Sequence, residues 1–126
     1  KEKYKTSTIF ITHALGVVAE IADYVVVVYA GCVIEKGTIQ EVFEQPSHPY
    51  TQGLFGCLPD IESEESAMLH VIRGSMPDPM DLPAGCKFCP RCDKAMDICR
   101  TTDPMDMSIG GEHTVKCHLY GKEELV

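Results

Sequence analysis

The sequence lacks an excess of positive charge, a long hydrophobic stretch and a secretion signal. Its 126 residues hold 11 Lys and Arg against 19 Asp and Glu, a formal net charge of -8. Nucleic-acid phosphates require a basic surface, so we expect no nucleic-acid partner. No apolar run approaches the roughly 20 residues that span a bilayer, and the longest, residues 24–30, has the length of a strand. Residues 1–5 show no signal-peptide pattern and no initiator Met, so we expect a portion of a longer chain.

The overall composition is that of an ordinary globular protein. Hydrophobic residues make up 44% and charged residues 24% of the chain, which does not indicate disorder. The length suits one domain or two small ones. The seven cysteines are an odd number, and nothing indicates secretion. A reducing compartment with free or metal-bound thiols is therefore favoured over a disulfide framework.

The first part of the chain predicts an incomplete α/β unit. Residues 7–12 and 24–30 are β-branched and aromatic and predict two buried strands, with a helix over 17–22 between them. The run at 24–30 has no polar face, which is typical of a strand covered on both sides. Residues 32–37 predict a paired strand after a turn. Because buried strands need neighbours, an isolated copy is expected to self-associate.

Two short helices are predicted next. Thr38 followed by Glu41 forms a capping-box pattern, which begins a helix that runs through Glu44. Prolines then interrupt the chain around residues 46–49, and an amphipathic pattern predicts a helix over 50–57.

The composition changes after this helix. Residues 59–66 are acidic and polar and predict a linker, 68–72 predict a brief strand, and the proline-rich residues 74–85 predict a loop. Little periodic structure is predicted over 85–120. We therefore expect three parts: 1–58, 59–82 and 83–126.

Five of the seven cysteines gather in the last part, at Cys86, Cys89, Cys92, Cys99 and Cys117. Thiolates spaced two or three residues apart on irregular backbone can converge on a soft ion or a cluster. By spacing alone, the first four are close to a ferredoxin-type run and equally suit tetrahedral zinc. Free thiols and a disulfide formed by oxidation remain alternatives. His113 and His118 flank Cys117 and are further candidate ligands.

His13 is the candidate for contact with a phosphate. It follows a predicted strand and precedes a predicted helix, the place where α/β proteins bind ligands. A histidine there can touch a phosphate or a catalytic water. A surface or capping role for His13 is the alternative.

Three segments resemble the ATPases of oligopeptide and dipeptide ABC importers. Residues 9–37 are similar to the end of an ABC ATPase domain from the strand before the switch histidine, and residues 45–52 (QPSHPYTQ) resemble its PxHPYT segment. Residues 83–92 (PAGCKFCPRC) resemble the PxGCxFxPRC motif of that branch. The motifs cover nearly the whole chain in the family's order. The resemblance implies the C-terminal part of an ABC-type P-loop ATPase domain, followed by a small irregular cysteine-rich extension.

The resemblance implies that His13 is the switch histidine, which contacts the γ-phosphate of ATP and helps position the attacking water. Ala14 departs from the acidic residue usual after this histidine. The sequence contains no phosphate loop, no Walker B acidic pair and no signature motif. We therefore expect the 126 residues alone to be inactive as an ATPase.

The resemblance also implies a metal centre. Cys86, Cys92, Cys99 and Cys117 match the ligands of a four-iron four-sulfur cluster, and Cys89 falls at a variable position of the motif. Zinc in the same place is the alternative cofactor.

The longer protein is implied to use ATP and magnesium to drive peptide uptake. Its implied partners are a second ATPase subunit and membrane permease subunits, with a peripheral location on the cytoplasmic face of the plasma (inner) membrane. Two other functions remain open: an ATPase for import of nickel or another small solute, and a stand-alone zinc or iron–sulfur module for interaction or redox sensing.

Overall fold

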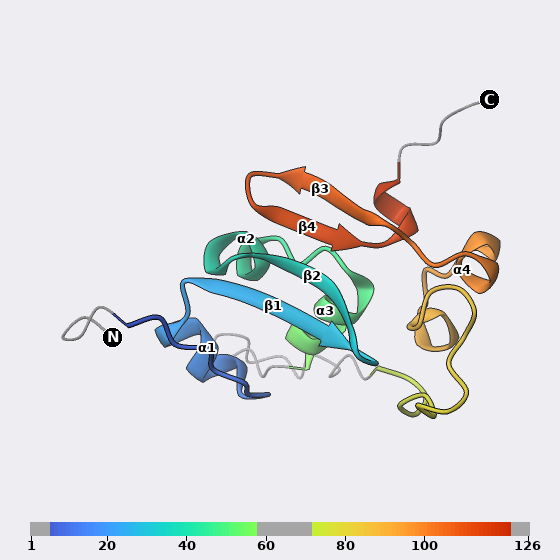
Figure 1. Ribbon diagram of the computed structural model, residues 1–126, viewed down its shortest axis with the longest axis horizontal. Helices are drawn as coiled ribbons and strands as arrows, with labels where there is room; N and C mark the ends of the chain where they lie inside the picture. The colour runs from blue at the N-terminus through green and yellow to red at the C-terminus, as the bar shows by residue number, and fades with distance from the viewer. Residues whose placement is uncertain (1–5, 58–71, 122–126) are drawn as a thin grey trace, which may run out of the picture.

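Two β-hairpins form one four-stranded antiparallel sheet in the computed structural model, which describes residues 6–57 and 72–121 (Figure 1). The first hairpin consists of β1 (Tyr24–Tyr29) and β2 (Cys32–Thr38), and the second of β3 (Asp106–Gly110) and β4 (His113–Lys116). The strand order is β1-β2-β4-β3. The central pairing joins β2 to β4, with Glu35 opposite Val115 and Lys36 opposite Thr114. The sheet therefore unites the part that resembles an ATPase with the cysteine-rich part.

The two strands predicted for the first hairpin are confirmed. Their turn is Ala30-Gly31, where both residues have positive φ (48° and 77°). Such a turn suits the twist of the flanking strands, and glycine adopts it without steric cost.

Three helices follow the predicted pattern within one or two residues. They are α1 (Leu15–Ile21), α2 (Ile39–Glu44) and α3 (Pro49–Gly56). Helices α2 and α3 cover one face of the sheet (Figure 1), and Val42 of α2 is fully buried. Among the residues that the structure describes, no helix is long and apolar enough to cross a membrane.

The predicted capping box at the start of α2 is confirmed. The Glu41 N–H donates to Oγ1 of Thr38 at 3.3 Å, and the Thr38 N–H donates to Oε2 of Glu41 at 2.9 Å. The other carboxylate oxygen, Oε1, accepts from the N–H of Glu112 at 3.1 Å. The Glu41 side chain therefore caps α2 and also accepts a hydrogen bond from the turn of the second hairpin.

The apolar core lies where the two parts of the chain meet. Tyr29 and Ile34 come from the first hairpin, and Phe88 comes from the cysteine-rich segment. The Phe88 ring contacts Tyr29 edge-on, with ring centroids 5.2 Å apart. Half-buried side chains pack around this cluster: Val27, Ala30, Tyr50, Ile72, Cys86 and Cys92. Cys86 and Cys92 thus pack against the main core.

The prediction of little periodic structure over residues 85–120 is wrong. The segment contains β3, β4 and α4 (Asp97–Thr101), together with 3-10 turns at Cys89–Arg91 and His118–Tyr120. Gly111, with φ of 55°, lies in the turn between the two strands, and Gly110, the last residue of β3, has φ of 128°. Strand β4 has only four residues, of which two are buried. A pattern so short gives a weak signal in the sequence.

The prediction of a strand over residues 7–12 is also wrong in this structure. This segment has no regular structure, and Ile9 and Ile11 are more than 90% exposed. The backbone groups of a strand need a paired neighbour, and the described residues place none beside it. An open groove of about 480 Å³ lies between this segment, α1 and β1.

The sequence predicted cover on both faces of the strand at 24–30. Within the described ranges, Tyr24, Val26 and Val28 of β1 stay exposed. The predicted linker at 59–66 lies outside the described residues. Of the strand predicted over 68–72, only Ile72 is described, and it is not in a strand.

Glu35 is the polar centre of the fold. Its side chain is 1% exposed, on β2 beneath the segment that leads into α3. Oε1 accepts from the N–H of Ser47 at 2.8 Å, and Oε2 accepts from the N–H of His48 at 2.9 Å. Oε1 also lies 2.6 Å from Nε2 of His113 on β4. One buried carboxylate therefore connects three parts of the chain.

Replacing Glu35 by Ala should destabilise the whole chain by about 3–5 kcal/mol, because two backbone N–H groups and a buried histidine lose their acceptor. Urea unfolding measures this free energy. Glu44→Ala removes an exposed carboxylate and should change the free energy by about 0.5 kcal/mol or less. Similar effects of the two substitutions would contradict the central role of Glu35.

Candidate functional site

Five cysteines line one small cavity beside the core: Cys86, Cys89, Cys92, Cys99 and Cys117. The cavity has a volume of about 10 Å³, close to the space of one water-sized sphere. His48 and Pro49 close it from the α3 side, and His118 borders it from the C-terminal side. Segments that are distant in sequence therefore meet at the thiols.

The backbone places the thiols through short turns. The N–H of Cys86 donates to the carbonyl of Cys99 at 2.8 Å, and the N–H of Cys92 donates to that of Cys89 at 3.2 Å. A Cβ at Gly85 would collide with the carbonyl oxygen of Cys99. Glycine is therefore required where the two cysteine-bearing segments come closest.

The environment keeps the thiols of Cys86, Cys92 and Cys117 protonated at neutral pH. Burial, with a smaller contribution from the nearby thiols of Cys86, Cys92 and Cys99, raises the pKa of the Cys117 thiol to about 11. Burial is also the main cause that raises the pKa of Cys86 and Cys92. A bound cation reverses this preference, because a thiol that coordinates a metal loses its proton.

The predicted ligand quartet and Cys89 occupy the same cavity. Within residues 6–57 and 72–121, no three His, Cys, Asp or Glu side chains are placed so that they could hold a metal ion. The thiols are thus gathered without the close arrangement that one ion requires. The metal centre and the choice of four ligands among five cysteines stay predictions.

His48 lines the cavity, and the sequence analysis did not identify it. Its ring is 1% exposed and lies 5.7 Å from the Phe88 ring, measured between centroids. Nδ1 accepts from the N–H of Tyr50 at 3.0 Å, which caps α3. Burial lowers the pKa of His48 to about 4, so the ring is neutral at physiological pH. The proline after His48 could have predicted the capping role of this residue. Proline favours the first position of a helix, which makes the residue before it the cap.

The two histidines near Cys117 take different places. Nε2 of His118 lies 2.8 Å from the carbonyl oxygen of Thr102, so it carries the proton and donates. His113 is buried against Glu35 and does not border the cavity. Of the two predicted additional ligands, only His118 lies beside the thiols.

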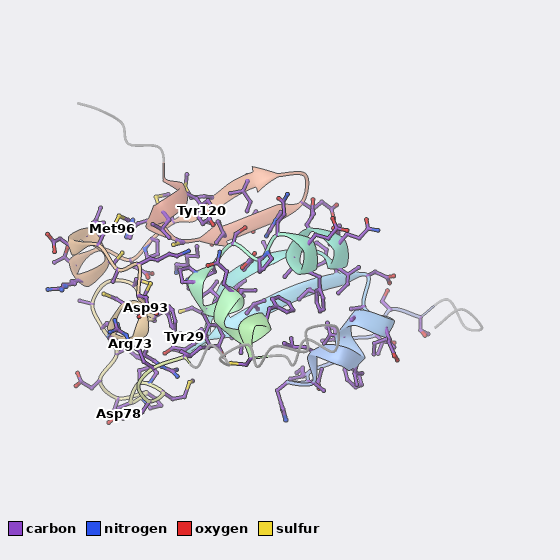
Figure 2. All side chains as sticks on the ribbon, turned by 180° about the vertical axis from the view of Figure 1, so that it is seen from behind. Tyr29, Arg73, Asp78, Asp93, Met96 and Tyr120 are labelled. Atoms are coloured by element: carbon purple, nitrogen blue, oxygen red, sulfur yellow. The ribbon has the colours of Figure 1, made fainter. Side chains whose placement is uncertain are left out.

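A polar cluster fastens the cysteine-rich segment to the end of β1. Nη1 of Arg91 donates to the hydroxyl of Tyr29 at 3.3 Å, and its guanidinium lies 5.9 Å from the centre of that ring. Nε of Arg73 lies 3.1 Å from Oδ1 of Asp93. Figure 2 shows Tyr29, Arg73 and Asp93 gathered on the same side of the molecule. The Arg91 contacts therefore connect the segment that carries Cys92 to β1.

His13 lies far from the thiols. It is exposed in the bend before α1, where the N–H of Ala14 donates to Oγ1 of Thr12 at 3.0 Å. Helix α1 lies beside the start of β1, whereas the cysteine-rich segment, yellow to orange in Figure 1, lies beyond the opposite end of that strand. The two candidate sites are therefore separate.

Comparison with known proteins places these motifs in a family. A family model described as "Oligopeptide/dipeptide transporter, C-terminal region" matches residues 34–99. The oligopeptide transport ATP-binding protein AppD of Bacillus subtilis is 48% identical over 122 residues, which are 97% of this chain and 37% of that protein.

Two further relatives match the chain with similar identity and coverage. The oligopeptide transport ATP-binding protein OppD of Salmonella typhimurium is 47% identical over 84% of this chain and 31% of its own length. The dipeptide transport ATP-binding protein DppD of Haemophilus influenzae is 42% identical over 94% of this chain and 35% of its own length. The chain thus spans about a third of the length of these relatives.

Acid should destabilise the chain partly through His48. Its folded-state pKa of about 4 lies below the ordinary 6.5, so the unfolded chain takes up the proton first as pH falls. This stabilisation is fully present above about pH 6.5 and is lost as pH falls toward 4, by on the order of 3 kcal/mol. Urea unfolding across this range measures the loss. His48→Asn retains a capping acceptor and should unfold with a smaller pH dependence; an unchanged dependence would refute the assignment.

Proposed function

Because the chain belongs to the oligopeptide/dipeptide transporter C-terminal family, we propose that it is part of the ATP-binding subunit of a peptide importer. The supporting observation is the family match over residues 34–99, which includes both the PxHPYT segment and four of the clustered cysteines. In the longer protein, ATP hydrolysis with magnesium would drive uptake of oligopeptides or dipeptides. The proposed partners are membrane permease subunits and a second ATPase subunit, at the cytoplasmic face of the membrane.

Two observations favour this function over the alternatives. The relatives are named for oligopeptide and dipeptide transport, which favours peptides over nickel or another small solute. The pairing of β2 with β4 argues against a stand-alone module with a remnant at its N-terminal side, because the first hairpin supplies half of the sheet. In the longer protein, we propose that residues 1–58 form the end of the ATPase domain, residues 59–82 a linker and residues 83–126 the cysteine-rich extension.

His13 is proposed to act on the γ-phosphate of ATP in that longer protein. Its exposed position before α1 leaves the ring accessible to a nucleotide held by other parts of the subunit. Phosphoryl transfer asks mainly for positioning and electrostatic stabilisation from the protein. A histidine that contacts the γ-phosphate and the attacking water would supply both.

The thiol cavity is proposed to hold a four-iron four-sulfur cluster through Cys86, Cys92, Cys99 and Cys117. The donors fit by chemistry, because soft thiolates are the ligands of such clusters. The same thiols suit zinc, the alternative. For either group the thiols would have to move apart, because the cavity of about 10 Å³ has room for one water-sized sphere and no three described side chains are placed to hold one ion. When bound, it would supply one-electron chemistry or a covalent link across the module.

The surrounding residues of the chain would exclude water from this centre. Phe88 is 3% exposed and packs against Tyr29 and the His48 ring. The backbone hydrogen bond from Cys86 to Cys99 joins the two cysteine-bearing segments without a metal. The extension would therefore keep its position against the ATPase part while the centre is loaded.

Alanine substitution should separate ligand thiols from the extra one. Cys117→Ala should prevent loading of the 126-residue chain after anaerobic reconstitution with iron and sulfide, whereas Cys89→Ala should keep full iron content. The measurements are bound iron and the visible absorbance near 400 nm that bleaches with dithionite. The opposite result would move the site to the ferredoxin-like run, and no effect from either substitution would indicate free thiols.

In the longer protein, His13→Ala should reduce ATP turnover at least about a hundredfold and leave ATP affinity within about threefold, because the group acts mainly on the transition state. Steady-state hydrolysis and nucleotide binding measure the two effects. A substitution at Glu20, which is exposed on α1, is the matched control. Equal losses of binding and turnover would argue for a structural histidine.

A further inference from the structure

The strand register divides the side chains of the sheet between two faces. Side chains directly opposite each other in an antiparallel pair point to the same face. Glu35 lies opposite Val27 and Val115, and its carboxylate bonds to the segment that leads into α3. This row therefore points to the face that α2 and α3 cover (Figure 1). The neighbouring residues point to the other, outer face, in one row across all four strands: Val26, Lys36, Thr114 and Ser108.

The outer face changes from apolar to polar between the two hairpins. On β1, Tyr24, Val26 and Val28 are 44%, 49% and 54% exposed. Val33 of β2, which pairs with Val28, is 42% exposed. We call these four residues the outer patch. The second hairpin presents the exposed Ser108 on the same face. A sheet face in water carries such polar residues, whereas adjoining exposed apolar side chains mark a surface that packs against another.

The outer patch continues into the open groove beside β1. Phe10 and Ile21, which are 58% and 49% exposed, line this groove together with Tyr24 and Val26. Strand β1 stands at one end of the sheet, so no strand within residues 6–57 and 72–121 pairs with its outer edge. The strand also carries no charged residue. Proteins ordinarily cover an apolar edge strand of this kind.

The length of the relatives indicates what covers this surface. The matched region is 31–37% of each relative, so about two-thirds of each lies outside it. The family model describes a C-terminal region, which places most of the remainder upstream. Thr6, the first described residue, lines the groove. A preceding part of a longer chain would therefore join this molecule beside the outer patch.

We propose that the outer patch and the groove beside it are the surface on which the upstream part of the longer subunit packs, and that this cover ends at β2. The outer face of the second hairpin then remains in water. The inference rests on the proposed function, because it takes the chain to be part of a longer ATP-binding subunit. Such a cover would also give residues 7–12 the neighbour that a strand needs.

Lysine substitutions at two positions of the outer row test both parts of the proposal, each made in the 126-residue chain and in the longer protein. In the 126-residue chain both side chains are exposed, so neither Val26→Lys nor Ser108→Lys should change Tm by more than about 3 °C. In the longer protein Val26→Lys should lower Tm by at least about 8 °C, because the cover would remove water from the ammonium group. Ser108→Lys should again stay within about 3 °C.

Hydrogen exchange of the two wild-type proteins gives a second measurement, which needs no variant that folds. The amides of residues 7–12 and those on the outer edge of β1 should exchange at least about tenfold more slowly in the longer protein than in the 126-residue chain. The amides on the outer edge of β3, at the opposite end of the sheet, should exchange at rates within about threefold of each other in the two proteins.

The other outcomes decide against the inference. A similar loss of Tm from Val26→Lys in both proteins, or equal exchange at residues 7–12 and β1, would refute the cover. Equal exchange together with a dimeric 126-residue chain in sedimentation would make a second copy the occupant instead. A loss from Ser108→Lys as large as that from Val26→Lys in the longer protein would refute the boundary at β2. ATP hydrolysis is measured separately: a longer protein that gives the expected results but hydrolyses no ATP would refute the proposed function and leave the docking surface in place.

Discussion

The buried carboxylate of Glu35 is the constraint on which the rest of the structure depends. A charge-bearing group with 1% exposure is costly unless every bond is satisfied. Here the partners are the N–H groups of Ser47 and His48 and the imidazole of His113. These partners come from different segments, so the carboxylate can be satisfied only when β2, the PxHPYT segment and β4 are all in place. The hydroxyl of Tyr120 adds a further bond, donating to the carbonyl of Ser47 at 2.7 Å, and Figure 2 shows Tyr120 beside the second hairpin.

The thiol cavity follows from this arrangement. Once the Glu35 bonds fix the backbone at His48, the ring of that residue forms one wall of the cavity, and Phe88 packs between it and Tyr29. The cysteines therefore do not form a separate loop beside the first hairpin. Their surroundings belong to the same core as the first hairpin, which gives the proposed metal centre a direct structural connection to the subunit that would bind ATP.

Local patterns in the sequence were enough to predict the first hairpin, the capping box of α2 and the gathering of the cysteines. Each depends on residues close in the chain or on strong side-chain chemistry. The pairing of β2 with β4 was not predicted, because it joins Glu35 to Val115 across 80 positions and β4 has only four residues. The place of His48 was missed for the same reason, since its neighbours Phe88 and Cys117 are distant in sequence. The predicted strand at 7–12 failed because a hydrophobic pattern cannot supply the neighbouring strand that its backbone needs.

Native-state hydrogen exchange of the 126-residue chain tests most directly whether the two parts form one cooperative unit. If Glu35 unites them, the slowest amides of the β1–β2 hairpin and those of the β3–β4 hairpin should exchange through the same opening. They should then give the same free energy and the same dependence on denaturant. Exchange of the β3–β4 amides at a markedly lower free energy, while the β1–β2 amides remain protected, would show that the cysteine-rich part opens independently and would contradict the account.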